Sequence, residues 1–437
     1  MIRPAIRGVA LFAAVIPLTL LVLAFDPSWW GLTLDAGALV LAVLGADALL
    51  ILPPHRLSVA VAIPSRLPVG EKGEAGVRLT APTAKRPLAV DVLLEITGEG
   101  GSVPPVTTLT LANGEIESAL EISSNRRGVL GVDALWLRWR GPFGLVERYR
   151  RVVLNRQIEI VPVVRGVRSA ALELASRQAM FGAKVQRQKG EGAEFEGLRD
   201  HTAGLDNRFI DWKRSARHRK LLSKEFRIER NHQVVLAFDT GHLMVEPING
   251  LARLDHAIEA GLLLGWVSLR SGDLVGCYGF DALVRHYQQP GRGVDYLARI
   301  QRGAARLDYC TEETNFTLGL AELNARLKRR ALVILFTEFV DTISAELLIE
   351  SLQRMANHHL VIFVTLKDPM LGRLITRAPT SFSNVAEAVV AQDFQRERAV
   401  VLERIARLGV HCLDVPVRGL SMALINRYFD IKQKGLM

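Results

Sequence analysis

VVLAFD, at residues 234–239, is a continuous apolar run that ends in a carboxylate, and it decides the fold of the C-terminal half of this chain. Four similar runs follow it, namely VGCYGF (275–280), ALVILF (331–336), LVIFVT (360–365) and VHCL (410–413). Segments with helical spacing separate them, at 251–270, 320–327 and 384–408. Uniformly apolar strands that alternate with helices predict a parallel sheet covered on both faces. We therefore expect an α/β domain over residues 233–437.

Acidic residues stand at the ends of these runs. Asp239, Asp281 and Asp414 end or directly follow three of them, and Glu338 and Asp368 come shortly after two others. The carboxyl ends of parallel strands meet along one edge of the sheet, where α/β proteins bind their ligands. We expect the functional site at this edge.

Residues 55–165 have a different pattern. Short β-rich runs alternate with Gly and Pro, at 57–63, 75–81, 88–96, 116–122, 134–140 and 158–164. In ALWLRWR (134–140), Leu135, Leu137 and Trp139 share one face of a strand, and Trp136 and Arg138 share the other. The pattern predicts an antiparallel β-sandwich of roughly six to eight strands. Nothing in this stretch resembles a catalytic constellation.

The apolar excess of the 437-residue chain, whose mean hydropathy is +0.18, lies at its N-terminus. GVALFAAVIPLTLLVLA (8–24) and GLTLDAGALVLAVLGADALLIL (31–52) are each about as long as a helix that crosses a bilayer. Since the second run follows the first almost at once, we expect a transmembrane hairpin over residues 1–54 rather than a cleaved signal peptide. Asp47 is expected near the interface, where a carboxylate costs little.

Basic residues flank the predicted hairpin on one side only. Arg3 and Arg7 precede it and His55 and Arg56 follow it, while the connector at 26–30 has no Lys or Arg. The positive-inside rule then places the protein in the inner (cytoplasmic) membrane, with its large C-terminal region in the cytoplasm. The absence of a CxxC pair agrees with a reducing compartment. The cysteines are Cys277, Cys310 and Cys412.

Residues 166–232 form a basic segment between the two folded regions. Between Arg208 and Arg230 nine Lys or Arg face three acidic residues, a surplus of six out of the formal net charge of +10. Three interpretations compete: nucleic-acid binding, contact with anionic lipid, or ion pairs that pack the segment on the α/β domain. Nucleic-acid binding is the weakest, because no helix-turn-helix or aromatic platform accompanies the charge. Trp212 is a lone aromatic that we expect to pack.

The basic segment also carries a long motif. It reads G-x-E-F-x-x-L-R-D at 192–200 and G-L-D-N-R-x-I-D-W-K-x-S-A-R at 204–217, and F-D-T-G follows at 238–241. Together with the two apolar runs and RRG…GPFGL (126–145), this pattern resembles a bacterial membrane-anchored family that carries the "domain of unknown function 58" and a von Willebrand factor A-like domain. Leu205 stands where that family usually has Asp, and His201 where it usually has Tyr.

The resemblance implies a protein partner, since no biochemical activity is established for the family. Genes of this family commonly neighbour those of MoxR-type AAA+ ATPases, so the resemblance implies such an ATPase as protein partner, in assembly, maturation or cell-envelope processes. Within the motif we expect a structural polar network. Its members are Arg199, Asp206, Arg208, Asp211, Trp212 and Arg217.

Von Willebrand factor A domains often bind Mg²⁺ through D-x-S-x-S, a loop Thr and a later Asp. Here Asp239 is present, but Gly241 and Leu243 occupy the two hydroxyl positions. Thr314 or Thr317 is available as the loop Thr, and Glu338 stands where the later Asp is expected. Because Mg²⁺ requires hard oxygen ligands, we expect a degenerate site that mediates protein contact. A divalent-metal-dependent adhesion module is the alternative.

No catalytic pattern accompanies these residues. The histidines form no HExxH motif, no GxSxG elbow occurs, and His242 beside Asp239 is the one suggestive pair. Cys277 and Cys412 lie within predicted strands, whereas Cys310 lies in a polar loop. We therefore expect a protein-interaction module that is not an enzyme and needs no cofactor.

Overall fold

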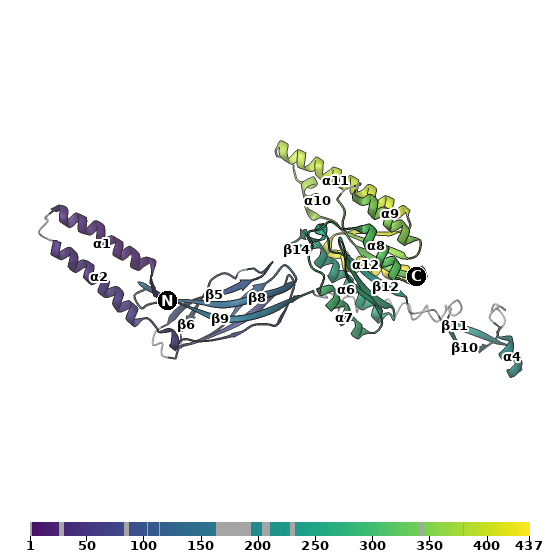
Figure 1. Cartoon of the computed structure of the whole chain (residues 1–437), viewed down its shortest axis with the longest axis horizontal. Coiled ribbons are helices and arrows are strands. Elements are labelled where there is room, and N and C mark those ends of the chain that lie inside the picture. Colours follow the sequence, from purple (N-terminus) through teal and green to yellow (C-terminus); the bar gives the residue numbers. More distant parts are fainter. Residues whose placement is uncertain are drawn as a thin grey trace. The chain divides into compact units, whose positions relative to one another are not determined.

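The computed structural model of the chain describes residues 2–25, 30–82, 87–102, 104–112, 114–162, 194–202, 210–227, 232–340, 342, 344–378 and 380–437. They fall into two compact units, Met1–Val161 and Pro162–Met437 (Figure 1).

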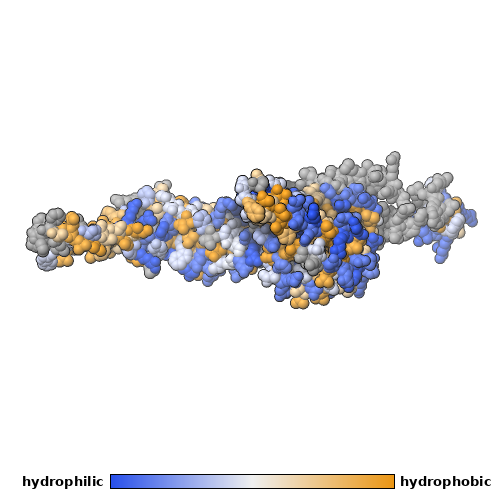
Figure 2. Space-filling view, turned by 90° about the horizontal axis from the view of Figure 1, so that it is seen from above, coloured by the Kyte–Doolittle hydropathy of each residue, from blue (hydrophilic) through white to orange (hydrophobic). Residues whose placement is uncertain are grey.

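Two apolar helices, α1 (Ile6–Phe25) and α2 (Trp30–Leu50), pack against each other in the first unit. Among the described residues one helical stretch, Thr33–Arg56, is long and apolar enough to cross a membrane, and Ile6–Val22 is a shorter apolar helix. Large apolar side chains on both helices are exposed. They form the hydrophobic surface that Figure 2 shows on the helical part of the first unit. Exposed apolar surface of this kind supports association with a membrane. That both helices span it stays a prediction.

Two β-sheets complete the first unit. The smaller is antiparallel and contains β2 (Ser58–Ala62), β4 (Lys72–Thr80) and β7 (Glu115–Ser123). The larger has the order β1-β9-β8-β5-β6, and β3 pairs with β9. Its strands are β1 (Ile2–Pro4), β3 (Arg66–Pro68), β5 (Leu88–Thr97), β6 (Thr107–Leu111), β8 (Gly128–Arg140) and β9 (Val146–Val161).

The predicted alternation in β8 is confirmed, because Leu135, Leu137 and Trp139 are at most 1% exposed whereas Trp136 is 38% exposed. The expectation of a purely antiparallel region is wrong at one strand, since β3 runs parallel to β9. The N-terminal residues, expected only as the flank of a membrane helix, join the sheet as β1.

A small hairpin is the first element that the structure describes in the second unit. β10 (Glu194–Asp200) pairs antiparallel with β11 (Leu222–Arg227), and α4 (Trp212–His218) precedes β11.

The α/β domain that follows is built on a sheet of order β16-β15-β12-β17-β18-β19. Its strands are β12 (Gln233–Asp239), β15 (Leu274–Phe280), β16 (Val284–Gly291), β17 (Ala331–Phe336), β18 (Leu360–Leu366) and β19 (His411–Val415). The five predicted strands are parallel, as expected. β16 is an antiparallel edge strand that the sequence pattern did not predict.

Helices cover both faces of this sheet (Figure 1). Leu236 and Phe238 of β12 pack in one core with α6 (Arg253–Arg270), α7 (Leu297–Ala305) and α12 (Leu420–Gln433). Val235 and Ala237 point into a second core with α8 (Phe316–Arg326), α9 (Ser344–Ala356) and α11 (Phe382–Arg407). The short elements α5 (His242–Val245), β13 (Pro247–Ile248), β14 (Leu251–Ala252) and α10 (Pro369–Thr376) lie in the loops after strands. This arrangement brings the carboxyl ends of the five parallel strands to one edge of the sheet.

Candidate functional site

Asp239 ends β12 and is 1% exposed. Its Oδ1 accepts hydrogen bonds from the Thr314 hydroxyl, 2.6 Å away, and from the Gly241 N–H, 2.9 Å away. Its Oδ2 accepts a hydrogen bond of 2.5 Å from the Thr337 hydroxyl. Thr314, one of the two predicted loop threonines, is therefore brought to Asp239 as expected.

Gly241 allows this close arrangement. A Cβ atom placed on Gly241 would lie 2.1 Å from Oγ1 of Thr314. The Thr314 hydroxyl therefore fills the space beside Asp239 that a side chain at position 241 needs.

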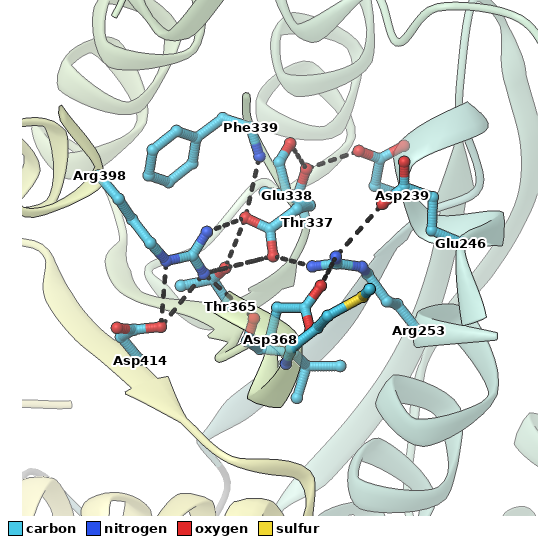
Figure 3. Close-up of polar contacts among 12 residues, drawn as sticks. Asp239, Glu246, Arg253, Thr337, Glu338, Phe339, Thr365, Asp368, Arg398 and Asp414 are labelled. Carbon is cyan, nitrogen blue, oxygen red and sulfur yellow. Dashed lines mark hydrogen bonds and ion pairs between the residues drawn. The ribbon is translucent and has the colours of Figure 1, made fainter. Parts of the chain in front are cut away.

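Glu338 makes a separate cluster, shown in Figure 3. Its carboxylate is 4% exposed and bonds to Nη1 of Arg253 at 2.9 Å and to Nη1 of Arg398 at 2.6 Å. The Thr365 hydroxyl donates to Glu338 at 2.9 Å, and the Phe339 N–H donates at 3.1 Å. Each lone pair of this buried carboxylate thus has a partner from the chain.

The two arginines link this cluster to the neighbouring strand ends. Arg253 Nη2 lies 3.3 Å from Asp368 and 3.2 Å from Glu246, and Arg398 Nη2 lies 3.1 Å from Asp414. The carboxylates that follow β17 and β18, and Asp414 near the end of β19, are thereby held by two guanidinium groups. The predicted edge is occupied by a network of ion pairs that is buried at its centre, Glu338 and Arg253, and partly exposed at its rim.

The environments of two neighbouring aspartates push their pKa values apart. Burial raises the pKa of Asp239 to about 6, although the hydroxyls of Thr314 and Thr337 oppose this effect. Burial would also raise the pKa of Asp281, but hydrogen bonds from Arg285, Cys310, Leu283 and Thr240 lower it to about 2. The difference arises because Asp281 has a guanidinium partner, whereas no such group bonds to Asp239 in the described part of the chain.

The donor set does not fit Mg²⁺ well. Asp239, Thr314 and Thr337 supply oxygen atoms, but Asp239 is the one carboxylate among them, and Glu338 is committed to two arginines. Within the described residues no group of three or more His, Cys, Asp or Glu side chains is placed to hold a metal ion. Mg²⁺ is usually held by carboxylates together with water.

The structure describes only part of the network expected from the motif. Asp206 and Arg208 lie outside the described residues, and the backbone of Arg199 pairs with Ser223. Asp211 caps α4 by accepting a 3.1 Å bond from the Arg214 N–H. Trp212, expected to pack, is 67% exposed at the first position of this short helix. Arg217 is also exposed. Because Asp206 and Arg208 are not described, the network as a whole stays a prediction.

Sequence reasoning missed Thr337, Arg253 and Arg398. Thr337 directly follows an apolar strand and precedes the predicted Glu338. Its position at the strand end was therefore a signal in the sequence that could have identified it. No sequence signal pointed to the two arginines, because Arg253 and Arg398 lie 85 and 60 residues from Glu338 along the chain.

These features define a membrane-associated protein whose α/β domain carries a closed polar cluster at its strand ends. Residues 197–404 match the family described as "Protein of unknown function DUF58", so the chain carries a DUF58 domain, as its motif predicted. No curated protein sequence matches the chain significantly.

Several solved structures are similar to parts of the chain. An aerotolerance-related membrane protein from Bacteroides fragilis is 14% identical, with 45% of this chain and 98% of that chain covered and a TM-score of 0.29. The conserved hypothetical protein BatB from Bacteroides thetaiotaomicron is 13% identical, with 41% and 99% covered and a TM-score of 0.25. An uncharacterized membrane spanning protein from Vibrio fischeri is 14% identical, with 46% and 98% covered and a TM-score of 0.18. TM-scores this low do not establish a shared fold.

Proposed function

We propose that the protein is a membrane-anchored protein-interaction module whose α/β domain binds a protein partner. The observation that carries this proposal is an exposed apolar stripe on the first half of α11. Phe382 is 89% exposed, Val385 44% and Val389 53%, and their spacing of three and four residues places them on one helix face. Contiguous exposed apolar side chains mark contact surfaces.

The closed cluster at the strand ends supports the same function. Because the carboxylates of Asp239 and Glu338 already have partners from the chain, they have little capacity left for a small ligand. Thiol chemistry is also disfavoured, since burial raises the pKa of Cys277 to about 12 and those of Cys310 and Cys412 to about 11. We therefore propose a role without catalysis.

For the partner, we propose an AAA+ ATPase of the MoxR type, acting in assembly, maturation or cell-envelope processes. This assignment rests on the resemblance of the motif at 192–217 to its family.

The test is a crosslinking pull-down of the full-length chain from native membranes. We expect to recover an ATPase with a phosphate-binding loop. Phe382→Ser together with Val389→Ser should reduce the recovery at least tenfold, because the apolar contact is lost. Val400→Ser is the matched control, since Val400 is 46% exposed further along the same helix. Equal recovery with all variants would contradict the role of the stripe, and no ATPase at all would contradict the proposed partner.

Metal-dependent adhesion is the second candidate, favoured by the convergence of Thr314 and Thr337 on Asp239. Calorimetric titration of the full chain in detergent with Mg²⁺ or Mn²⁺ separates the two functions. We expect no saturable binding at millimolar concentration. Saturable binding that Asp239→Ala abolishes would establish the metal site instead.

A further inference from the structure

Asp47 lies close to the C-terminal end of α2 and is completely buried. Its Oδ1 accepts a 2.9 Å hydrogen bond from the Phe143 N–H. Its Oδ2 accepts bonds of 2.8 Å and 2.9 Å from the N–H groups of Leu145 and Val146. One carboxylate of the apolar helix therefore holds the whole turn between β8 and β9. Charge-assisted bonds of this kind are stronger than neutral ones.

Glycines make this interlocking possible on both sides of the turn. A Cβ on Gly141 would lie 2.3 Å from Oδ1 of Asp47, and a Cβ on Gly8 would lie 2.4 Å from the carbonyl oxygen of Leu145. The Ala5 N–H donates a 2.8 Å hydrogen bond to the same carbonyl. The turn is thus fixed between the first turn of α1 and the last turn of α2.

Further bonds join the helix ends to the sheet. β1, which directly precedes α1, pairs with β9. The indole Nε1 of Trp139 donates to the Leu52 carbonyl at 3.0 Å, and Nη1 of Arg150 donates to the Pro54 carbonyl at 2.8 Å. The apolar helices and the larger sheet are therefore joined as one body, without a free linker in the residues that the structure describes.

The tip of this fixed turn is apolar and exposed. Phe143 is 58% exposed, and the neighbouring helix ends carry Ile6, Leu49 and Leu50, which are 89%, 88% and 61% exposed. Arg7 and Arg56, also exposed, flank the same helix ends and suit anionic headgroups. Apolar side chains beside basic ones are typical of elements that lie in the membrane interface.

We propose that the β8–β9 turn, residues 141–145, is a membrane-contacting element in which Phe143 enters the lipid interface beside the helix ends. Asp47 is its positioning residue. The inference rests on the membrane anchor of the proposed function. The occupant is lipid because the turn continues the exposed apolar surface of α1 and α2, to which it is directly bonded.

The test places a photo-crosslinking aromatic residue in the turn. The full chain with Phe143→p-benzoyl-phenylalanine is reconstituted in nanodiscs of phosphatidylcholine and phosphatidylglycerol, irradiated, and analysed by mass spectrometry. Val129 is the matched control position, since it is also 58% exposed but lies at the other end of β8. That end is roughly 35 Å away along the strand. We expect a lipid adduct at position 143 and none at position 129.

The two proposals fail differently in this experiment. A chain that is retained in nanodiscs but gives no lipid adduct at 143, or equal adducts at 143 and 129, would overturn the membrane-contacting turn. A chain that does not enter nanodiscs would overturn the anchor itself.

The role of Asp47 is tested in the same labelled chain. Asp47→Ala should lower the adduct yield at position 143 several-fold, because three N–H groups lose their acceptor. Asp47→Asn, which keeps one acceptor oxygen, should give an intermediate yield. Asp35→Ala is the control, since Asp35 is an exposed carboxylate in the same helix. Unchanged yields with both Asp47 variants would exclude Asp47 as the positioning residue.

Discussion

At the scale of single residues, Glu338 is the centre of the α/β domain's polar chemistry. It is buried between Arg253 and Arg398, so removing its carboxylate takes from both guanidinium groups the counterion that is best shielded from water. We expect Glu338→Ala to lower the free energy of unfolding by about 3–5 kcal/mol. Denaturant unfolding of the full chain in detergent, followed by circular dichroism, measures this loss.

Glu346 is the matched control for this prediction. It also forms a two-bond pair with an arginine, Arg404, but it is 55% exposed in its side chain. Glu346→Ala should cost far less stability than Glu338→Ala, because exposed ion pairs are weak. Similar losses in the free energy of unfolding for the two variants would show that burial of the Glu338 cluster adds little to stability.

Asp239 should make the protein less stable as the pH rises. Because its pKa is about 6 in the fold against an ordinary value of 3.8, the folded state favours the protonated form. This contribution is fully present below about pH 4 and is lost as the pH rises through about 6, a change of up to about 3 kcal/mol. Asp239→Asn should gain stability over the parent between pH 4 and pH 7, as measured by unfolding at each pH.

Asp281 is the control, because its pKa is shifted in the opposite direction from that of Asp239. Its pKa of about 2 lies below the ordinary value, so its contribution is present above about pH 4 and is lost as the pH falls through about 2. Asp281→Asn should therefore destabilise the protein at pH 7. A gain for both variants at pH 7 would show that the two carboxylates do not differ as the geometry implies.

At the scale of elements, the hairpin of β10, α4 and β11 depends on local capping bonds. Asp211 caps α4, and its contact with the Lys224 ammonium is 3.9 Å long. We expect Asp211→Ala to cost about 1 kcal/mol, which is typical of a lost N-cap. Hydrogen exchange of the α4 amides measures it. A loss of about 3–5 kcal/mol would instead support the buried polar network expected from the motif.

The parallel strands β12, β15, β17 and β18 were predictable because each is buried on both faces and so reads as an unbroken apolar run. The edge strand β19 is mostly half-buried, and its apolar run is correspondingly short. β16 was not, because its residues are nearly all partly exposed and QQPG (288–291) has no strand pattern. β1 has three residues, too few for periodicity. At the site, Asp239 and Thr314 could be predicted from a strand end and a loop. Arg253 and Arg398 could not, because tertiary folding alone brings them to Glu338.

At the scale of the whole molecule, two compact units share one chain, and the first joins apolar helices to a β-sheet. Asp47, expected near the interface, is buried by three backbone N–H groups of that sheet's turn. A carboxylate in an apolar helix is otherwise costly. Its bonds explain why this one is tolerated, and they make the helices part of a folded body rather than a separate tether.

The orientation of this body in the membrane follows from its charges. Arg3 and Arg7 precede α1, His55 and Arg56 follow α2, and the connector between the helices has no Lys or Arg. We propose that both outer ends stay in the cytoplasm. Green fluorescent protein fused after Met437 should fluoresce, whereas alkaline phosphatase at the same position should be inactive. Asp26→Arg with Ser28→Arg, which adds positive charge to the connector, should weaken this bias. Active phosphatase after Met437 in the parent chain would reverse the proposed orientation and exclude a cytoplasmic ATPase as the partner.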